Sequence, residues 1–400
     1  MAGQSVAIIG AGIAGLTAAL AFAARGAAAT VFERAPRIEE LGAGLQLSPN
    51  ATRLLARLGV LDEVKRKAVE PKSVVIRCAR DLRPLAEVPL HMAERRWGAP
   101  YLVMRRSDLQ GVLLEAARGN DGIAIRTGTE VSNLCLDRTG GSVRPNIANS
   151  SELAPAFDLA VAADGVWSAT RQRMGGPKSR FTGDIAYRAI LDAGKAGPFR
   201  DRLLPSDQVV TFASPGFHLV AYPLPDGAFN LVIIVRGQDM PRHWTNVAEA
   251  AQISGTARNI ATELKRLITV TGIWHAWPIH EVKSAAPWCQ AGRIVLIGDA
   301  AHAVAPHAAQ GAAMAIEDAV LLANLTTRSG APGRTLDLFE KLRRPRLIRV
   351  AMRGQFNHFA WQVGGPIALV RNLILKARSG EKLAADFDWL YGYDVEKAAA

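Results

Sequence analysis

The sequence predicts an α/β fold in which a parallel sheet is interleaved with an antiparallel sheet and followed by a helical segment. Three observations lead to this fold class. Residues 4–32 follow a strand, helix, strand pattern, which makes a parallel pair with a right-handed crossover. Residues 181–277 contain short alternating apolar segments, which are typical of antiparallel strands. Residues from 334 onward follow a helical pattern and are rich in arginine.

The first strand runs directly into a G-x-G-x-x-G loop formed by Gly10, Gly12 and Gly15. In such a loop the first glycine permits a tight turn, the second a close approach to a pyrophosphate, and the third close packing of helix on strand. The next strand, residues 29–32, ends at Glu33, whose carboxylate can accept hydrogen bonds from a ribose. The pattern predicts a Rossmann-like dinucleotide-binding unit.

The stretch 41–50 follows this unit and contains Ala43 and Gly44 among other small residues. Small residues permit the backbone to approach a ligand closely, so we expect this loop to contact the dinucleotide. Ser48 and Pro49 are expected to begin the next helix. Further along, Ser107 or Asp108 is a candidate N-cap.

Later strands of the parallel sheet are expected at three places. Residues 123–125 and the step 129–131 resemble the next strand, and a turn-rich hairpin is expected over 133–155. Two continuous apolar strands then end in acidic residues, Asp164 and Asp299.

The antiparallel sheet is expected to cover a substrate pocket. Its candidate strands lie at 74–77, 85–88, 209–212, 218–222 and 229–235, and a helical pattern covers 247–268. His218 and Tyr222 are four residues apart on one of these strands. Because side chains alternate along a strand, both are expected on the same face.

Bulk properties exclude several classes of protein. The net charge is +12, but lysine and arginine are spread along the chain without a basic run interleaved with aromatic residues, so nucleic-acid binding is not expected. Three scattered cysteines show no metal-ligand spacing, which fits a cytoplasmic protein. The first strand begins too early for a signal peptide. Glycines interrupt the apolar run 8–24, so no integral membrane segment is expected.

Glu33, Asp164 and Asp299 at strand ends, together with the glycine loop, resemble the single-component flavoprotein aromatic hydroxylases (group A flavoprotein monooxygenases). The resemblance covers nearly the whole chain and is strongest to the branch of salicylate hydroxylase and 3-hydroxybenzoate 6-hydroxylase. It rests on the loop GAGLQL-x-PNA at 42–51, the run GDAAH…QGA-x-MA-x-ED at 298–318 and the tail WLYGYD at 389–394.

This resemblance implies an FAD-binding domain of three segments, 1–74, 101–180 and 281–333. It implies a substrate domain of residues 75–100 and 181–280 with an antiparallel sheet, and a C-terminal helical region, 334–400. The residues implied to bind FAD are Gly10, Gly12, Ala14, Gly15, Glu33, Arg34, Ala43, Gly44, Arg106, Val131, Asp164, Asp299, Pro306, Gly311, Ala312 and Ala313.

The same resemblance implies an NAD(P)H-consuming monooxygenase that hydroxylates a small phenolic or heteroaromatic acid with dioxygen, through a flavin hydroperoxide. Only one dinucleotide fingerprint occurs, which agrees with NAD(P)H binding transiently. No metal is expected. His218 and Tyr222 are the implied catalytic residues, with His218 removing a phenolic proton. Gln46, Pro306 and His307 are expected to join them around the substrate, although relatives usually have an aromatic residue at position 307.

Two alternatives remain open at this stage. A ubiquinone-type or polyketide ring hydroxylase of the same fold would need a larger pocket or a membrane-facing patch, and the stretch 342–370 keeps that reading open. A flavin-binding regulator without turnover is the alternative from another class. Salt-bridged helices or the face of a homodimer would explain the stretch 342–370 equally well.

Overall fold

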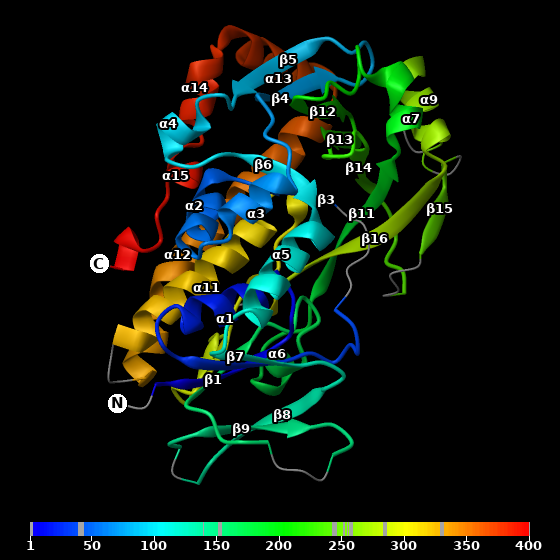
Figure 1. Cartoon of the computed structure of the whole chain (residues 1–400). Coiled ribbons are helices and arrows are strands. Elements are labelled where there is room, and N and C mark those ends of the chain that lie inside the picture. Colours follow the sequence, from blue (N-terminus) through cyan, green and yellow to red (C-terminus); the bar gives the residue numbers. More distant parts are fainter. Residues whose placement is uncertain are drawn as a thin grey trace.

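The strand, helix, strand unit predicted at the start of the chain is present. It consists of β1 (Ser5–Ile9), α1 (Ile13–Ala23) and β2 (Ala28–Phe32), and β1 and β2 pair in parallel. The computed structural model, shown in Figure 1, describes residues 3–38, 44–138, 140–150, 154–241, 246–250, 253, 255, 259–282, 286–328 and 332–399.

Among these described residues, β1 lies inside a six-stranded sheet with the order β17–β18–β10–β1–β2–β7. All neighbours are parallel except the β17–β18 pair at one edge. The additional strands are β7 (Ile123–Arg126), β10 (Leu159–Ala162), β17 (Cys289–Gln290) and β18 (Ile294–Leu296). Parallel strands place their carboxyl ends at one edge, so the ends of β1, β2, β10 and β18 lie together.

The two faces of this sheet are covered differently. Val6 and Ile8 pack into the large core formed with the helices α1, α5 (Arg106–Arg118) and α11 (Gly311–Arg328). Ala7 and Ile9 alternate with them and belong to a smaller core on the opposite face. That second face is covered by the hairpin of β8 (Val131–Leu136) and β9 (Val143–Ile147), at the bottom of Figure 1.

Two local expectations need correction here. Residues 129–131 do not extend the parallel sheet: β7 ends at Arg126, the Thr129 amide bonds to the Glu33 carbonyl, and Val131 begins the separate hairpin. The helix α5 already begins at Arg106, with Arg105 in the N-cap position, so neither Ser107 nor Asp108 caps it. The chain turns into this helix directly from β6 (Leu102–Arg105), leaving no loop residue to act as a polar cap.

The second sheet has the order β15–β16–β11–β14–β13–β12–β4–β5 among the described residues. Its strands are antiparallel except for the β4–β12 pair, which is parallel and joins distant parts of the chain. The strand bounds are β4 Ser73–Cys78, β5 Pro84–Pro89, β11 Arg180–Leu191, β12 Gln208–Ser214, β13 Phe217–Pro223, β14 Phe229–Arg236, β15 Val247–Glu249 and β16 Ile273–Glu281.

The strands of this sheet run one or two residues beyond the substrate-domain limits expected from the sequence, and the division into domains stays a prediction. The helical pattern expected over 247–268 is only partly right. Val247–Glu249 is an edge strand, and the helix α9 covers Thr262–Thr271. The edge pairing of β15 with β16 overrides the local periodicity.

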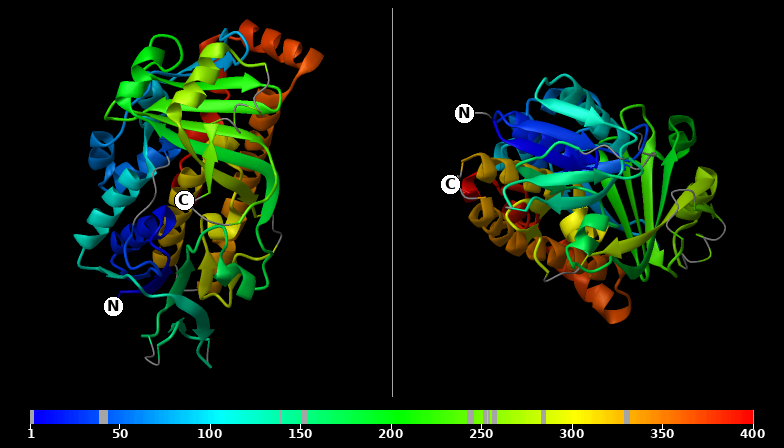
Figure 2. Two further views of the ribbon diagram at one scale, coloured as in Figure 1. Left: turned by 90° about the vertical axis from the view of Figure 1, so that its right-hand side faces the viewer. Right: turned by 90° about the horizontal axis from the view of Figure 1, so that it is seen from below.

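The C-terminal region is helical, as predicted, and its longest helix, α12 (Pro332–Gln362), runs beside both sheets (Figures 1 and 2). At 31 residues it is about 46 Å long at 1.5 Å per residue. The other elements are β3 Gly44–Leu47, α2 Pro49–Arg57, α3 Leu61–Arg66, α4 Ala93–Trp97, α6 Ala169–Arg173, α7 Ala193–Ala196, η1 Gly197–Phe199, α10 Asp299–His302, η2 Pro306–Ala308, α13 Gly365–Ala377, α14 Gly380–Ala385, α15 Asp388–Tyr391 and η3 Lys397–Ala399.

A buried ionic network fixes α12 to α11. Arg343 Nη1 lies 2.5 Å from Glu317 Oε2, and Arg343 Nε lies 2.6 Å from Asp318 Oδ1. Arg346 Nη2 adds a bond of 2.9 Å to Glu317 Oε1. Asp318 also accepts hydrogen bonds from the Gly298 amide and His302. The network therefore holds the loop before α10 against both long helices.

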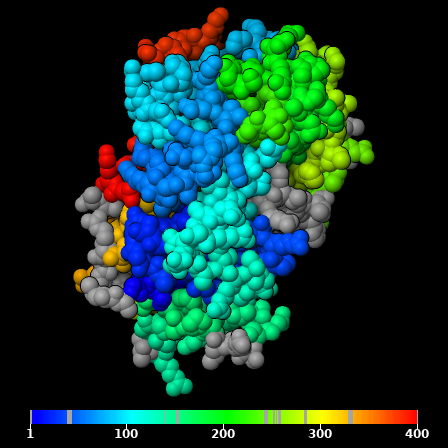
Figure 3. Space-filling view, viewed as in Figure 1, coloured from blue at the N-terminus to red at the C-terminus, as the bar shows by residue number. Residues whose placement is uncertain are grey.

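The space-filling view shows the eight-stranded sheet gathered at one end of the molecule and the β8–β9 hairpin at the other (Figure 3). The helices α2, α3 and α5 lie between these ends on the visible face. Within the described parts of the chain, no helix combines the length and the apolar character that crossing a bilayer requires.

Candidate functional site

The glycine loop after β1 leaves open space beside the start of α1. Gly10 has φ +104°, and a Cβ there would lie 2.6 Å from the Ala163 carbonyl oxygen; a Cβ on Gly15 would lie 1.9 Å from the Gly10 carbonyl oxygen. A Cβ on Gly12 would meet nothing within 4 Å. Gly12 is also the N-cap of α1, and no side chain caps the helix. The first N–H groups of α1, including that of Ala14, therefore face a space suited to an anion.

Glu33, at the end of β2, lies against this loop. Its Oε2 accepts the Ala11 amide at 2.8 Å, and its Oε1 accepts the Ala35 amide at 2.9 Å. Arg34 next to it is exposed. Val131 lies two residues beyond Thr129, whose amide bonds to the Glu33 carbonyl at 2.8 Å. The structure thus brings together three of the positions predicted to bind FAD.

Asp164 and Asp299 lie at the same edge of the sheet. Asp164 Oδ2 accepts the Thr170 amide at 3.1 Å, whereas its Oδ1 is buried without a hydrogen-bond partner among the described residues. Asp299 is exposed at the first residue of α10. The buried Arg171 joins the two loops by donating to the carbonyls of Val166 and Ala300 at 2.7 and 2.8 Å.

The N-terminus of α11 forms a second set of backbone donors. The Met314 amide bonds to the Gln310 carbonyl at 2.8 Å, so the N–H groups of Gly311, Ala312 and Ala313 precede the intrahelical ladder. A Cβ on Gly311 would also meet nothing within 4 Å. This helix end points backbone dipoles at a space where a negative charge is favoured.

Side chains tie this second helix end to the loop after β2. Gln310 Nε2 donates to Ser48 Oγ at 2.9 Å, and Ser48 Oγ lies 2.6 Å from Asn50 Oδ1. Ser48 therefore occupies the predicted position before α2, but its hydroxyl bonds within this network and does not cap the helix. Arg106 follows β6, which pairs with β3 so that Arg105 lies opposite Gly44. The predicted contact Ala43 lies outside the described residues.

These features fit FAD at the edge of the parallel sheet. Two helix N-termini face open space, small residues permit close approach, and Asp164 retains an unpartnered buried oxygen. A dinucleotide offers a pyrophosphate and hydroxyl groups for these partners. The predicted cofactor residues within the described chain thus gather from segments that lie far apart in the sequence.

The predicted pair on β13 shares a face, as expected. His218 lies opposite Ile234 and Tyr222 lies opposite Asn230 on β14. Leu219 alternates with them and packs into the core behind the sheet, whereas Tyr222 belongs to the core shared with the parallel sheet. His218 and Tyr222 therefore face the cofactor side, and both are buried.

Tyr222 lies against the loop that begins β3. The Gly44 amide donates to Asn230 Oδ1 at 2.7 Å, and a Cβ on Gly44 would lie 2.5 Å from the Tyr222 hydroxyl. Burial raises the pKa of Tyr222. Gln46 Oε1 accepts a hydrogen bond from the Tyr101 hydroxyl at 2.6 Å, and burial raises the pKa of Tyr101 as well. Both phenols stay neutral and can donate hydrogen bonds.

His218 lies at the other end of this face, beside the last turn of α12. Its Nδ1 is 2.9 Å from Gln362 Nε2, and its Nε2 is buried without a hydrogen-bond partner in the described chain. The Trp361 ring stands edge-on at 5.1 Å between centroids, and the His307 ring at 5.8 Å. Burial, followed by the charges of His307 and His358, holds the pKa of His218 well below its usual range.

Pro306 and His307 open the short helix η2, and the His307 ring lies against His218 on β13. Burial, with smaller contributions from His358 and Arg236, lowers the pKa of His307 to about 3. The neutral His307 stacks on His358 at 4.3 Å between centroids with an angle of 14°. It presents a flat ring to His218, as an aromatic side chain would.

Asp184, His307 and His358 place three potential ligand atoms within 4.8 Å of one another. Asp184 Oδ2 is 3.9 Å from His307 Nε2 and 3.5 Å from His358 Nε2. However, imidazole lone pairs lie in the ring plane, so two stacked rings cannot both point at one ion. The Arg236 guanidinium, 3.5 Å from Asp184 Oδ1, also opposes a cation. This cluster is therefore a polar group of side chains beside His218.

The residues predicted from the sequence do not include those that α12 places around His218. Asn357 Nδ2 donates to the His307 carbonyl at 3.0 Å, and His358, Trp361 and Gln362 surround His218. One signal was available: His358 and Gln362 are four residues apart in a helix and so share a face. Asn230 and Asp184 were missed because their roles depend on the pairing of strands.

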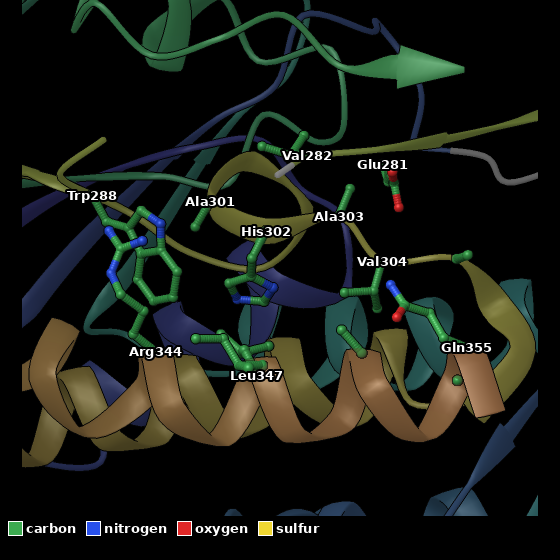
Figure 4. Close-up of a pocket in the computed structure, with 14 residues that line it drawn as sticks. Glu281, Val282, Trp288, Ala301, His302, Ala303, Val304, Arg344, Leu347 and Gln355 are labelled. Atoms are coloured by element: carbon green, nitrogen blue, oxygen red, sulfur yellow. The ribbon is translucent and has the colours of Figure 1, made fainter. Parts of the chain in front are cut away.

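Figure 4 shows a pocket of about 250 Å³ between α12 and residues 301–305. Trp288 and Arg344 lie at one end, with the Arg344 guanidinium 4.7 Å from the Trp288 ring centroid, and Gln355 lies at the other. His302 on its wall bonds to the buried Asp318 at 2.5 Å. This bond gives His302 a structural role, and the residues that line the pocket do not include His218, His307 or His358.

Comparisons with known proteins agree with this geometry. Residues 4–353 match the family described as FAD binding domain. The chain is 32% identical to 3-hydroxybenzoate 6-hydroxylase of Polaromonas naphthalenivorans (strain CJ2), over 99% of this chain and 97% of that protein. It is 30% identical to 6-hydroxynicotinate 3-monooxygenase of Bordetella bronchiseptica (strain ATCC BAA-588 / NCTC 13252 / RB50), over 98% of this chain and 95% of that protein.

The same fold occurs in the solved structure of a salicylate hydroxylase substrate complex. The TM-score is 0.83 at 23% identity, with 100% of this chain and 97% of that chain covered. The match over 350 of the 400 residues, together with the glycine loop and the acidic strand ends, shows that the chain belongs to the family of FAD-binding proteins defined by this domain.

Proposed function

We propose that the protein is an FAD-dependent, NAD(P)H-consuming monooxygenase that hydroxylates a small phenolic or heteroaromatic acid. The observation that carries the proposal is the position of His218 and Tyr222 on one sheet face, with Tyr222 in the core shared with the parallel sheet and His218 against His307. The relatives named above act on hydroxybenzoate and hydroxynicotinate according to their names, and those small aromatic acids support the substrate class.

The residues proposed to hold FAD are those that the structure gathers at the sheet edge. The glycine loop and the start of α1 would take the pyrophosphate, and Glu33 and Arg34 the ribose. Asp164 and Asp299 would bind hydroxyl groups on the flavin side, and the N-terminus of α11 would favour negative charge on the ring. Bound FAD supplies the redox chemistry and the activation of dioxygen.

The protein's own part is to bind and orient the aromatic ring and to keep water away. Tyr222 and Gln46 would hold one side of the substrate, and His218, His307 and Pro306 the other. Val220 lies between His218 and Tyr222 on the same face of β13, and it pairs with Val232. These apolar side chains make the centre of the face suitable for an aromatic ring and exclude water from it.

Arg188 is proposed to complement the carboxylate of the substrate. It lies opposite Val232 on β11, in the row of paired residues that contains Val220. Its guanidinium lies 5.9 Å from the Trp277 ring centroid, and its charge lowers the pKa of Tyr222 against the larger effect of burial. A guanidinium can bind a carboxylate through two parallel hydrogen bonds.

We further propose a homodimer that forms through the apolar face of the C-terminal helices. α13 has no buried residue. An exposed apolar surface of this extent usually marks an interaction site. The large apolar side chains exposed on α12 and α13 are Leu338, Ile348, Met352, Phe356, Phe359, Ile367, Leu369, Val370, Leu373 and Ile374. A monomer by light scattering at micromolar concentration would contradict this assembly.

A cytoplasmic location is proposed because NAD(P)H is the reductant.

The test is a screen of aromatic acids for stimulated NAD(P)H oxidation by the purified yellow protein, followed by identification of the product. A hydroxylated product formed in step with NAD(P)H consumption supports the proposal. Protein that binds FAD but oxidises NAD(P)H with no aromatic acid would instead favour a flavin-binding regulator. Turnover confined to large polycyclic or quinone-like rings would favour the ring hydroxylases of polyketide or ubiquinone type.

A further inference from the structure

The amide of Gln362 determines which nitrogen of His218 carries the proton. Gln362 Nε2 lies 2.9 Å from His218 Nδ1 and 3.3 Å from the Ile234 carbonyl oxygen. A carbonyl oxygen only accepts hydrogen bonds, so the NH₂ group of Gln362 must be the group that faces it. The opposite orientation of the amide would place Gln362 Oε1 against the Ile234 carbonyl oxygen, two acceptors with no hydrogen between them. The same NH₂ group therefore donates its second hydrogen to His218 Nδ1.

The other nitrogen of His218 consequently carries the proton. Burial holds the pKa of the imidazole well below its usual range, and the neighbouring His307 and His358 lower it further. A neutral imidazole has one N–H and one lone pair. With the Nδ1 lone pair occupied by Gln362, the hydrogen is on Nε2, and this Nε2 has no hydrogen-bond partner among the described residues.

Gln362 is itself held in place. Its backbone carbonyl accepts the Gly216 amide at 3.1 Å, and Gly216 lies in the turn between β12 and β13. The Trp361 ring next to it packs edge-on against His218. The last turn of α12 is thus fixed to the hairpin that carries His218, so the orientation of the amide and the tautomer of the ring are coupled.

We propose that Gln362 is a positioning residue that makes His218 a hydrogen-bond donor, through Nε2–H, to an ionised oxygen of the substrate. This proposal rests on the proposed function and assigns the ionised form of the hydroxyl as the species bound. The hydroxyl proton passes to solvent when the substrate binds, and the resulting phenolate oxygen accepts the Nε2–H bond. His218 keeps its own proton throughout. A hydrogen bond to an anionic acceptor is about twice as strong as a neutral one.

This role differs from the general base expected from the spacing of His218 and Tyr222. A base needs a free lone pair, and the only lone pair of the neutral ring is bonded to Gln362. The charged or titratable groups around the ring are His307 from η2 and His358 from α12, with Asp184 and Arg236 behind them. Stabilising the phenolate makes the aromatic ring of the substrate as electron-rich as removal of its proton by His218 would.

The tautomer can be tested without substrate by ¹⁵N NMR of the holoprotein labelled at histidine, with H218N assigning the signal. The unsubstituted protein is expected to show a neutral His218 with Nε2–H at pH 7. Gln362→Glu is expected to reverse the tautomer, because its carboxylate accepts a bond from Nδ1–H. Gln362→Met, which only removes the donor, should give a mixture. Nδ1–H or a charged ring in the unsubstituted protein would overturn the proposal.

The matched control is Gln355→Glu, which makes the same change at an exposed position two turns earlier on α12. It is expected to leave the His218 signal unchanged. A change of tautomer in this control equal to that in Gln362→Glu would show a general charge effect and would also overturn the proposal.

A second measurement follows the bound ligand. A hydroxynitrobenzoate changes colour when its hydroxyl ionises, so its absorbance in the complex reports the bound species. The unsubstituted protein should bind the phenolate, and Gln362→Glu should weaken that binding roughly tenfold to a hundredfold. Binding of the neutral phenol to the unsubstituted protein would contradict the proposal. Failure of every aromatic acid to be hydroxylated would remove the proposed function but leave the NMR result standing.

Discussion

The backbone amide of Gly44 donates a hydrogen bond of 2.7 Å to Asn230 Oδ1. This bond joins the loop after the first βαβ unit to the strand β14 of the other sheet, 186 residues away in sequence. Asn230 lies opposite Tyr222, so the same contact closes one end of the proposed substrate pocket. The β3–β6 pair and the eight-stranded sheet therefore meet at a place where a small residue is required.

Gly44→Ala should disturb the substrate side of the pocket. The new Cβ would lie 2.5 Å from the Tyr222 hydroxyl and 2.6 Å from Asn230 Cγ, which forces the loop or both side chains to move. We expect KM for the aromatic acid to rise roughly fivefold to a hundredfold, at a cost of about 1–3 kcal/mol for such overpacking. Steady-state kinetics measure this change in KM. Gly111→Ala, where a Cβ meets nothing within 4 Å, is the control, and equal KM values for both variants would contradict the argument.

Arg188→Met should weaken binding of the carboxylate specifically. Removing a guanidinium that binds an anion costs about 1.5–3 kcal/mol, so KM for the acid should rise roughly tenfold to a hundredfold. The corresponding primary amide of the substrate should be affected much less. Arg180→Met changes a 75% exposed side chain at the start of the same strand and should leave KM unchanged. A similar loss for acid and amide would show that Arg188 acts on packing alone.

Asp299→Asn should reduce the affinity for FAD without unfolding the protein. The Asp299 side chain is exposed at the start of α10, so its replacement leaves the core intact, but it removes a charged acceptor for a cofactor hydroxyl. We expect the Kd for FAD to rise about tenfold or more, measured by quenching of flavin fluorescence. Asp121→Asn, at another exposed site, serves as the control. An unchanged Kd would remove Asp299 from the cofactor site.

The sequence predicted the parts of the fold whose signals are local. The glycine loop, the acidic strand ends and the shared face of His218 and Tyr222 depend on short patterns with fixed periods. The roles of Asn230 and Gln362 depend on which strand pairs with which and where a 31-residue helix ends. The donor or acceptor state of His218 likewise follows from a partner 144 residues away. Such contacts leave no local pattern in one sequence.

Arg343→Met should destabilise the protein strongly, because it leaves two buried carboxylates short of a partner. Arg343, Glu317 and Asp318 are all fully buried. Breaking such a group by removing one partner costs about 3–5 kcal/mol, which chemical denaturation measures. Arg334→Met, at an exposed site on the same helix, should change stability by less than about 0.5 kcal/mol. A small effect of Arg343→Met would mean that water or a shifted arginine replaces the lost partner.

Acid should destabilise the fold through His307, and the sign follows from its pKa. Burial lowers the pKa of His307 to about 3 from the usual 6.5. Between these values the unfolded chain binds a proton that the folded chain does not, so stability rises with pH across this window and falls as the pH drops below about 6.5. The contribution approaches about 1.4 kcal/mol per pH unit for one proton. His307→Gln removes this contribution, so the free energy of unfolding of this variant should fall less steeply from pH 6 to pH 4 than that of the unsubstituted protein.

Denaturant titrations at several pH values measure the two slopes. His275→Gln, at an exposed position of β16, should keep the slope of the unsubstituted protein. Parallel curves for His307→Gln and the unsubstituted protein would show that His307 takes up its proton in the folded state.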